Sequence, residues 1–308
     1  KASCRPPAAS ASLLVSMPVL SGPPVVTLRH ASARPYDAAI AAARTCYAPR
    51  VIGAEEVTPS QRETIGPLTF EAGHHTVYQH AHFEFGLENV SRQLVWTFLH
   101  SHPFYNSEQS SQRFVRLDEA RALVPEGLSS EALAVYEGAI LSAWESYRRL
   151  TGLLKADTLR ILSGLRHLTP TASEKRRKKV EREAEKKAIE LARYVIPVAA
   201  FTSMVHTVSG IVLHRLHRML RTGAAPTETR AVVEAMVRLV NERDPAFFER
   251  IGQGPLAEAE VVEARLPRVE ADGDAEAARL DARLGSRVSL LVDHMARAEE
   301  TTADAVRA

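Results

Sequence analysis

The sequence predicts an α+β protein, with a mixed sheet and flanking helices in its first half and a helical second half. Residues 80–90 alternate polar and apolar side chains, which is the period of a strand with one buried face. Large apolar residues recur at steps of three and four between Ser129 and Leu168, which is the spacing of an amphipathic helix. The chain of 308 residues, with 45% apolar and 25% charged residues, is also long enough to bury a core.

The first half is predicted to alternate strands and helices. Short β-prone runs indicate strands at 25–28, 80–90 and 112–115, and helical spacing indicates helices at 35–46, 58–73 and 91–98. A proline at the start of the first helix and Thr58-Pro59 at the start of the second are typical of helix N-termini. The polar stretch 103–109 is rich in turn formers, so we expect a loop there.

The second half is predicted to be helical. We expect two packed helices within 129–168, a helix at 173–194, a long apolar helix at 201–221, and a helix from Pro226 to just before Asp244. The expected organisation is therefore a disordered leader at 1–24, one domain at 25–251, and a flexible linker with an accessory helix at 252–308. The accessory helix is expected within 288–306, where the sequence is amphipathic.

Composition and charge argue against several classes of protein. The formal net charge of +2 is close to neutral, so we expect no nucleic-acid partner, and any anion site must be local. The basic start of the helix at 173–194 is soon balanced by glutamates, which favours a solvated face over a polyanion site. No apolar run reaches the roughly 18 to 20 residues of a membrane-spanning helix. Two cysteines, Cys4 and Cys46, cannot build a disulfide framework, which fits a reducing, cytoplasmic location.

Histidines are concentrated between positions 74 and 102. They are His74, His75, His80, His82, His100 and His102. On the expected strand, His80 and His82 would share one face, which is a recurring geometry of metal ligands. No H-E-x-x-H motif accompanies them. A metal centre, a ligand-binding site and partly exposed histidines on a polar sheet face are all open interpretations.

Two segments could bind a phosphate. The loop from Asn106 to Arg113, which includes Gln109 and Ser111, combines backbone N–H groups and hydroxyls with a guanidinium, and such groups can hold a phosphate dianion. An ordinary structural loop is the alternative. Arg193 stands among apolar residues, so we expect it to be half-buried and to need an anionic partner, either a ligand or a protein carboxylate.

Polar residues also follow one face of the expected helix at 201–221. His206, Gly210, Leu213, His217 and Arg221 recur at steps of three and four residues. This pattern is typical of a cavity lining, although histidines bound to backbone carbonyls in a core give the same pattern.

Taken in order, these segments resemble the flavin-dependent thymidylate synthase family between about Val25 and Ile251. The matching motifs are Ala42-Ala43-Arg44-Thr45-Cys46-Tyr47, Gly73-His74-His75-Thr76 with His80, Val90-Ser91-Arg92, Ser111-x-Arg113, Ala192-Arg193 before Ile196-Pro197, the Thr202 segment, Ala225-x-x-Glu228 and Asp244-Pro245-x-x-Phe248. Their order and spacing make the match more specific than any single motif.

The resemblance implies the family's fold, a homotetramer with shared active sites, and the reductive methylation of dUMP. The methylene donor would be methylenetetrahydrofolate, the cofactor FAD and the reductant NADPH. Carried over by position, Ser111, Arg113 and Arg193 would bind the substrate phosphate with Gln109 beside them, and Arg221 would act on the pyrimidine. The residues on the flavin side would be Thr76, His80, His100, His102, Ser209 and Arg215.

The sequence departs from the family on the flavin side. His100-Ser101-His102 stands where the family has R-H-R, and Ser209-Gly210-Ile211 stands in place of its N-A-R. An isoleucine cannot hydrogen-bond a diphosphate. The sequence therefore predicts a divergent member that keeps the phosphate-binding residues. Two alternatives stand beside it: a nucleotide-binding paralogue that has lost the flavin reaction, and a histidine metalloprotein.

Overall fold

The computed structural model describes residues 19–101, 105–222, 226–251, 254–261, 273–291, 297–300 and 303. The chain divides into two units, Lys1–Glu258 and Ala259–Ala308. In the second unit the structure describes the helix α9 (Gly273–Leu284). Part of the segment 288–306, where the sequence predicts an accessory helix, lies outside the described residues.

Residues 1–18 of the expected leader also lie outside the described residues. Leu20 is described, and its backbone N–H donates to the Ala120 carbonyl at 2.8 Å while its carbonyl accepts from Ala122 N at 3.1 Å. Backbone pairing therefore begins before Val25. The domain boundary expected between 251 and 252 stays a prediction.

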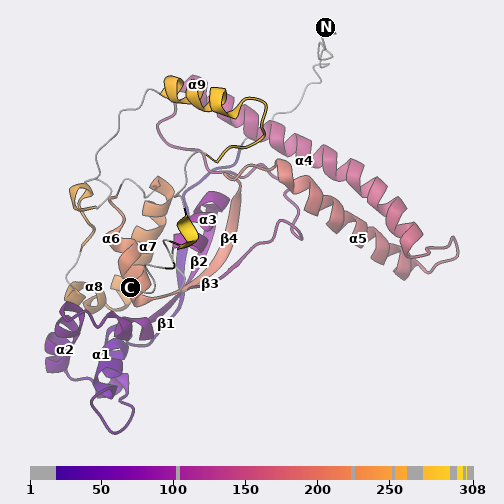
Figure 1. The fold of residues 1–308 in the computed structure, drawn as a ribbon. Helices are drawn as coiled ribbons and strands as arrows, with labels where there is room; N and C mark the ends of the chain where they lie inside the picture. The colour runs from indigo at the N-terminus through magenta and orange to yellow at the C-terminus, as the bar shows by residue number, and fades with distance from the viewer. Residues whose placement is uncertain are drawn as a thin grey trace. The chain divides into compact units, whose positions relative to one another are not determined.

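An antiparallel sheet lies at the centre of the first unit (Figure 1). Its strands are β1 (Val25–Ala31), β2 (His82–Ser91), β3 (Tyr105–Gln109) and β4 (Phe201–Ser209). The spatial order is β1-β2-β4-β3, so β4 is a central strand that pairs with β2 on one side and with β3 on the other. The strands expected at 25–28 and 80–90 are confirmed, and so is the α+β fold class. The named strands pair only in the antiparallel sense, so the sheet is not the mixed one expected from the sequence.

The structure describes eight α-helices in the first unit. They are α1 (Pro35–Thr45), α2 (Pro59–Glu71), α3 (Arg92–Ser101), α4 (Ser130–Leu165), α5 (Glu174–Ala192), α6 (Gly210–Arg218), α7 (Thr227–Arg243) and α8 (Ala246–Ile251), with short 3-10 helices η1 (Ala54–Glu56), η2 (His75–His80) and η3 (Arg193–Val195). Thr58 caps α2, because its hydroxyl accepts from Gln61 N while the Gln61 side chain accepts from Thr58 N. Ser173 caps α5, because its hydroxyl accepts from Arg176 N. None of the described helices is long and apolar enough to cross a membrane.

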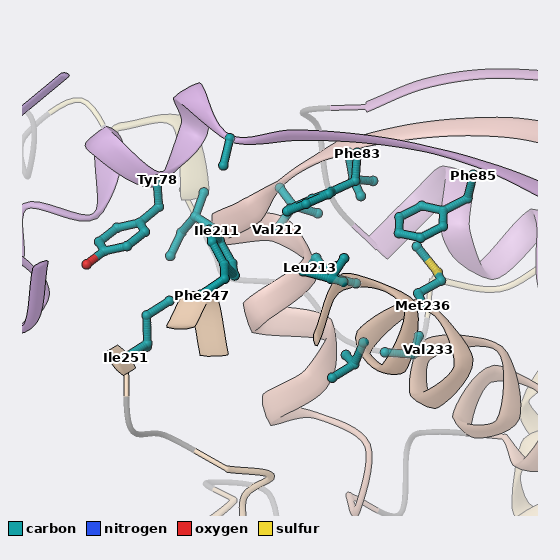
Figure 2. Packing of buried hydrophobic residues seen from close by; sticks show 14 of the residues in the cluster. Tyr78, Phe83, Phe85, Ile211, Val212, Leu213, Val233, Met236, Phe247 and Ile251 are labelled. Atoms are coloured by element: carbon teal, nitrogen blue, oxygen red, sulfur yellow. The ribbon is translucent and has the colours of Figure 1, made fainter. Parts of the chain in front are cut away.

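The main core lies between one face of the sheet and the helices α6 and α7 (Figure 2). Phe83 and Phe85 alternate with polar residues on β2 and are fully buried. Met236 of α7 and Leu213 of α6 belong to the same buried cluster. The alternation read from the sequence therefore correctly identifies the buried face of β2.

Helices α4 and α5 form an antiparallel pair (Figure 1). Lys155 pairs with Glu185 at 3.2 Å and Arg166 with Glu183 at 2.7 Å, and these ion pairs join the two helices. In the first half of α4, Trp144 packs in a second buried cluster that also holds residues of the segment following β3. The helix pair is thus anchored beside the end of β3.

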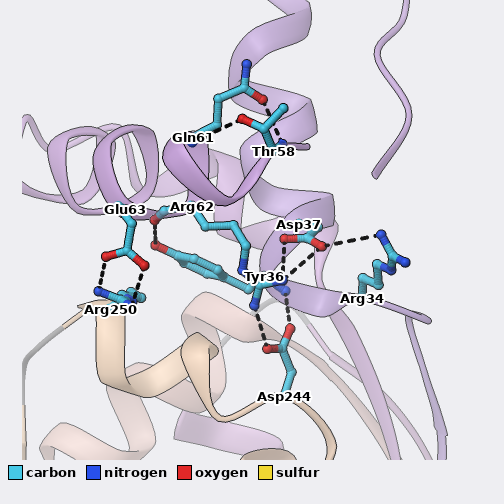
Figure 3. Close-up of polar contacts among 9 residues, drawn as sticks. All are labelled: Arg34, Tyr36, Asp37, Thr58, Gln61, Arg62, Glu63, Asp244 and Arg250. Carbon is cyan, nitrogen blue, oxygen red and sulfur yellow. Dashed lines mark hydrogen bonds and ion pairs between the residues drawn. The ribbon is translucent and has the colours of Figure 1, made fainter. Parts of the chain in front are cut away.

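A charge network ties α1 and α2 to the junction of α7 and α8 (Figure 3). Arg62 of α2 lies 2.9 Å from a carboxylate oxygen of Asp37 and 3.2 Å from one of Asp244. The second oxygen of Asp244 accepts from Tyr36 N at 3.0 Å. Burial raises the pKa of Asp37, although Arg62 opposes the rise. Asp244, in the Asp244-Pro245 motif, thus holds the start of α1 next to the end of α7.

The two helices expected within 129–168 are a single helix of 36 residues, α4. Its glycines at 138, 152 and 164 do not interrupt it, because they face open space and the helix gains stability by packing along α5.

The expected long helix at 201–221 is also wrong. Residues 201–209 form β4, and only 210–218 are helical. Burial alternates along β4, with Thr202, Met204, His206 and Val208 buried. Its threonines and valines are β-branched and favour a strand over a helix.

The strand expected at 112–115 is a turn, and the strand lies instead at 105–109, where a loop was predicted. Strand β3 exists because it pairs with β4, with Ser107 opposite His206. Once β4 is misread as a helix, the partner that makes β3 a strand is missing from the prediction.

Candidate functional site

Two of the arginines selected from the sequence contact the same residue. The guanidinium of Arg113 lies 2.5 Å from a carboxylate oxygen of Glu190, and Arg193 Nε donates to the backbone carbonyl of Glu190 at 3.0 Å. Lys187 pairs with the other carboxylate oxygen at 3.1 Å. The structure therefore brings Arg113 and Arg193 together, although they come from different elements.

The turn after β3 positions Arg113. Ser110 N donates to the Ser203 carbonyl at 2.9 Å, which fastens the end of β3 to β4. The chain then turns at Ser111, whose carbonyl accepts from the N–H groups of Phe114 and Val115. Ser111 Oγ accepts from Arg113 N at 3.3 Å, so its own hydroxyl hydrogen can still donate to a ligand.

Arg193 lies where α5 ends and η3 begins. It is half-buried, as expected from its apolar neighbours, and its guanidinium stands over the Tyr194 ring at 5.3 Å. Among the described residues it forms no ion pair with a carboxylate. The anionic partner expected for it is therefore not a described side chain.

The Glu190 carboxylate neutralises part of the positive charge of Arg113 and Lys187. Hydrogen bonding from Lys187, followed by the charges of Arg113 and Lys187, lowers the pKa of Glu190, so its carboxylate is ionised at neutral pH. A phosphate dianion could replace this carboxylate on Arg113, because both groups accept charge-assisted hydrogen bonds from a guanidinium.

A cavity of about 530 Å³ lies on the same turn. Ser111, Arg116, Arg121, Trp144 and Thr202 are among the residues that line it. This volume is within the range of small-molecule sites, roughly 300–1,000 Å³.

The predicted substrate residue Gln109 ends β3, where its side-chain oxygen is buried and has no hydrogen-bond partner in the described part of the chain. The turn that carries Ser111 and Arg113 begins directly after Gln109.

The residues predicted to face a flavin come from two segments that meet. Gly210 N donates to the Ala81 carbonyl at 2.7 Å, and Ser209 of β4 stands opposite His82 of β2. Because His80 directly precedes Ala81, these pairings place Ser209 near His80. His80 ends η2 and His82 begins β2, so the expected placement of both on one strand face is wrong. Thr76 and His80 are exposed.

These residues fit a flavin in part. The buried hydroxyl of Ser209 has no hydrogen-bond partner among the described residues, and the exposed Arg215 offers a free cation on α6. Ile211 lies in the core with Tyr78 and Phe247 and offers no polar group (Figure 2). The side chain of His100 and the whole of His102 lie outside the described residues.

The predicted catalytic residue, Arg221, lies in the turn after α6 and is exposed. Burial, followed by the charges of Arg218 and Arg221, lowers the pKa of His217 in the same region. No described contact joins Arg221 to Arg113, Arg193 or Glu190. The expected helical face from His206 to Arg221 does not exist, because His206 lies on β4.

Histidines do not form a metal centre in the part of the chain that the structure describes. No three residues of the types His, Cys, Asp and Glu come together there in a way that could hold an ion. His75 stacks on Phe70 with ring centroids 4.4 Å apart, and His206 is fully buried with its Nδ1 bonded to Ser107 Oγ. These two histidines are parts of the packed structure.

Two residues at the site were not selected from the sequence. Glu190 could have been found, because a glutamate three positions before Arg193 on a helix lies on the same side of that helix. Arg92 was available only as part of the Val90-Ser91-Arg92 motif. It is half-buried near Arg193, whose charge contributes to lowering the pKa of Arg92 after the larger effect of burial.

Fold and site together define an α+β protein with a candidate anion site, in which the turn after β3 meets the end of α5. The profile of the family described as thymidylate synthase complementing protein matches residues 27–246. The chain therefore belongs to this family, as the resemblance implies.

Individual relatives agree with the family match. The chain is 27% identical over 233 residues to a flavin-dependent thymidylate synthase of Clostridium tetani, a match that covers 74% of this chain and 86% of the relative. It is 28% identical over 227 residues to a flavin-dependent thymidylate synthase of Geobacter sulfurreducens, covering 71% and 84%. Among solved structures, the UMP/dUMP methylase PolB from Streptomyces cacaoi bound with 5-Br dUMP is similar in fold, with a TM-score of 0.53 at 18% identity, covering 76% of this chain and 96% of that one.

Proposed function

We propose that this chain is a divergent flavin-dependent thymidylate synthase that reductively methylates dUMP or a related pyrimidine nucleotide. Methylenetetrahydrofolate would donate the one-carbon group, with FAD as cofactor and NADPH as reductant. The observation that carries the proposal is the meeting of Arg113 and Arg193 at Glu190, beside the Ser111 turn. The printed functions of the curated relatives support the same reaction class.

The phosphate of the nucleotide would bind to Ser111, Arg113 and Arg193, with Gln109 close to the sugar and phosphate. Two guanidinium groups and a hydroxyl can donate several charge-assisted hydrogen bonds to one dianion. Arg221 would stand near the pyrimidine carbonyls, where a fixed positive charge stabilises negative charge that develops on the ring.

A bound flavin would supply the hydride for the reductive step. Thr76, His80, Ser209 and Arg215 would hold it, together with His100 and His102. Because Arg221 has no described contact with the arginines at Glu190, we propose that a complete site joins residues of different subunits of a homotetramer. Phe114, Tyr194 and Val198 support this proposal, because they are large, apolar and exposed close to the two arginines.

The direct test is to purify the full chain and measure its absorption spectrum, its binding of dUMP by calorimetry, and the formation of thymidylate with methylenetetrahydrofolate and NADPH. A flavin spectrum, saturable dUMP binding and thymidylate formation would support the proposal. Saturable dUMP binding without flavin uptake would instead support the nucleotide-binding paralogue, which the buried, apolar Ile211 favours. Absence of binding to dUMP and to related pyrimidine nucleotides such as UMP would overturn both.

A further inference from the structure

Arg92 is a cation in an environment that opposes its charge. It is the first residue of α3, at the helix end where a positive charge is unfavourable. The side chain is half-buried, and both burial and the neighbouring charge of Arg193 lower its pKa. A bare arginine at such a position costs stability.

The backbone of Arg92 is fixed beside the segment that follows Arg193. Arg92 N donates to the Ala200 carbonyl and Gln93 N donates to the Val198 carbonyl, each at 3.1 Å. The start of α3 is therefore held against residues 198–200, a few positions after the end of η3. This arrangement explains how Arg92 and Arg193 come within electrostatic range of each other.

Neither arginine has a carboxylate partner among the residues that the structure describes. Arg193 donates to a backbone carbonyl, and no described hydrogen bond or ion pair involves the Arg92 guanidinium. Two neighbouring half-buried cations without a counter-ion repel each other. An anion bound between them would remove this repulsion and satisfy their donors.

Glu228 fixes the start of α3 through Ser91. Ser91 N donates to one carboxylate oxygen of Glu228 at 2.7 Å, and the Ser91 hydroxyl donates to the other oxygen. Ser91 Oγ also accepts from Leu94 N at 3.1 Å, which caps the first turn of the helix. The carboxylate is thus engaged with Ser91, next to Arg92, and this contact links the two motifs Val90-Ser91-Arg92 and Ala225-x-x-Glu228.

We propose that Arg92 is a third phosphate-binding arginine, which shares the phosphate of the bound nucleotide with Arg193, and that Glu228 is the residue that positions it. The proposal rests on the proposed function for the identity of the ligand. It assigns a role in binding to two motifs that the phosphate site of Arg113 and Arg193 leaves unexplained.

The test compares Arg92→Gln with the unchanged full chain. Calorimetric titrations use dUMP, deoxyuridine and inorganic phosphate, and thermal melts are recorded with and without dUMP. We expect dUMP and phosphate affinities to fall about tenfold or more, because a charge-assisted contact is lost. Deoxyuridine affinity should not change, since it carries no phosphate. The ligand-free melting temperature should stay the same or rise, because an uncompensated charge is removed.

Arg160→Gln is the matched control, since it removes one arginine from the exposed face of α4. It should change none of these quantities. Unchanged dUMP and phosphate affinities in Arg92→Gln would overturn the proposal. A large drop in its ligand-free melting temperature would also overturn it, because that result would show a structural role.

Glu228→Ala tests the positioning role. It should weaken dUMP binding when Arg92 is present and have little further effect in the Arg92→Gln background, whereas Glu228→Gln should restore part of the affinity. Additive losses in the double variant would refute the positioning role.

The phosphate titration also separates the two proposals. If the unchanged chain binds phosphate through Arg92 but makes no thymidylate, the proposed reaction fails and the arginine assignment stands. If it binds neither phosphate nor dUMP, the arginine assignment fails as well.

Discussion

Arg113 and Glu190 form an ion pair with an N–O distance of 2.5 Å, at the place where the proposed function puts the substrate phosphate. Glu190 is half-buried and is also paired with Lys187. In the proposed function, a phosphate bound at Arg113 would compete with the Glu190 carboxylate for the N–H groups that the carboxylate now occupies. We therefore expect Glu190 to weaken nucleotide binding.

Glu190→Gln should tighten dUMP binding. The glutamine keeps the shape of the side chain but replaces a charge-assisted contact to Arg113 with a neutral one, so dUMP affinity should rise by roughly fivefold or less. Calorimetric titration measures the change. Glu185→Gln, on the same helix but paired with Arg116 and Lys155, is the control. Weaker binding in Glu190→Gln would show instead that the carboxylate orients Arg113 for the ligand.

Arg113→Ala and Arg193→Ala should each lower dUMP affinity by about one to two decades, since charge-assisted contacts are worth roughly 1.5 to 3 kcal/mol. The fold should be little affected, because Arg113 is exposed and Arg193 is only half-buried. Circular dichroism checks the fold and calorimetry the affinity. Arg160→Ala, on the exposed face of α4, provides the comparison, and equal dUMP affinities in all three variants and the unchanged chain would rule out the phosphate assignment.

The sequence predicts the parts of this fold that depend on local signals. Thr58 and Ser173 mark helix starts correctly, and the alternation around Phe83 and Phe85 correctly identifies a strand. The sequence-based prediction fails at 201–209. A segment that mixes apolar, β-branched and polar residues can form either a strand or a helix, and its packing partners decide which. The same limit applies to the site: the pairing of Arg113 with Glu190 depends on how α5 docks beside the turn after β3, and no local pattern encodes that docking.

His217 should make stability depend on pH. Burial lowers its pKa, so on acidification the unfolded chain takes up a proton before the folded chain does. The free energy of unfolding should therefore fall as pH drops below the ordinary histidine value of about 6.5. Melting temperatures between about pH 7 and pH 5 measure this slope, and His217→Gln should reduce it. His74→Gln, which removes an exposed imidazole, is the control, and a slope that is the same with and without His217 would contradict the prediction.

Arg62→Met should destabilise the fold by about 3 kcal/mol, because it leaves the buried Asp37 carboxylate without its main cation. Urea unfolding followed by circular dichroism measures the loss. Arg50→Met is the matched control, since Arg50 pairs with Glu56 on the surface with 61% of its side chain exposed, and such exposed pairs contribute little to stability. Equal losses in the two variants would mean that burial of the carboxylates is unimportant here.

Two glycine-to-alanine substitutions should have opposite effects on stability. At Gly210, a Cβ would lie 2.2 Å from the buried Phe247 ring and 3.1 Å from the Tyr78 carbonyl, so Gly210→Ala should cost about 1–3 kcal/mol through overpacking. At Gly152, inside α4, no neighbouring atom lies within 4 Å of the new Cβ. Gly152→Ala should therefore stabilise the protein by about 0.5–1 kcal/mol, because alanine loses less backbone entropy in a helix. Urea midpoints of both variants give the sign directly. A stable Gly210→Ala would mean that Phe247 can move away, and the start of α6 would then be less tightly packed than the contact distances indicate.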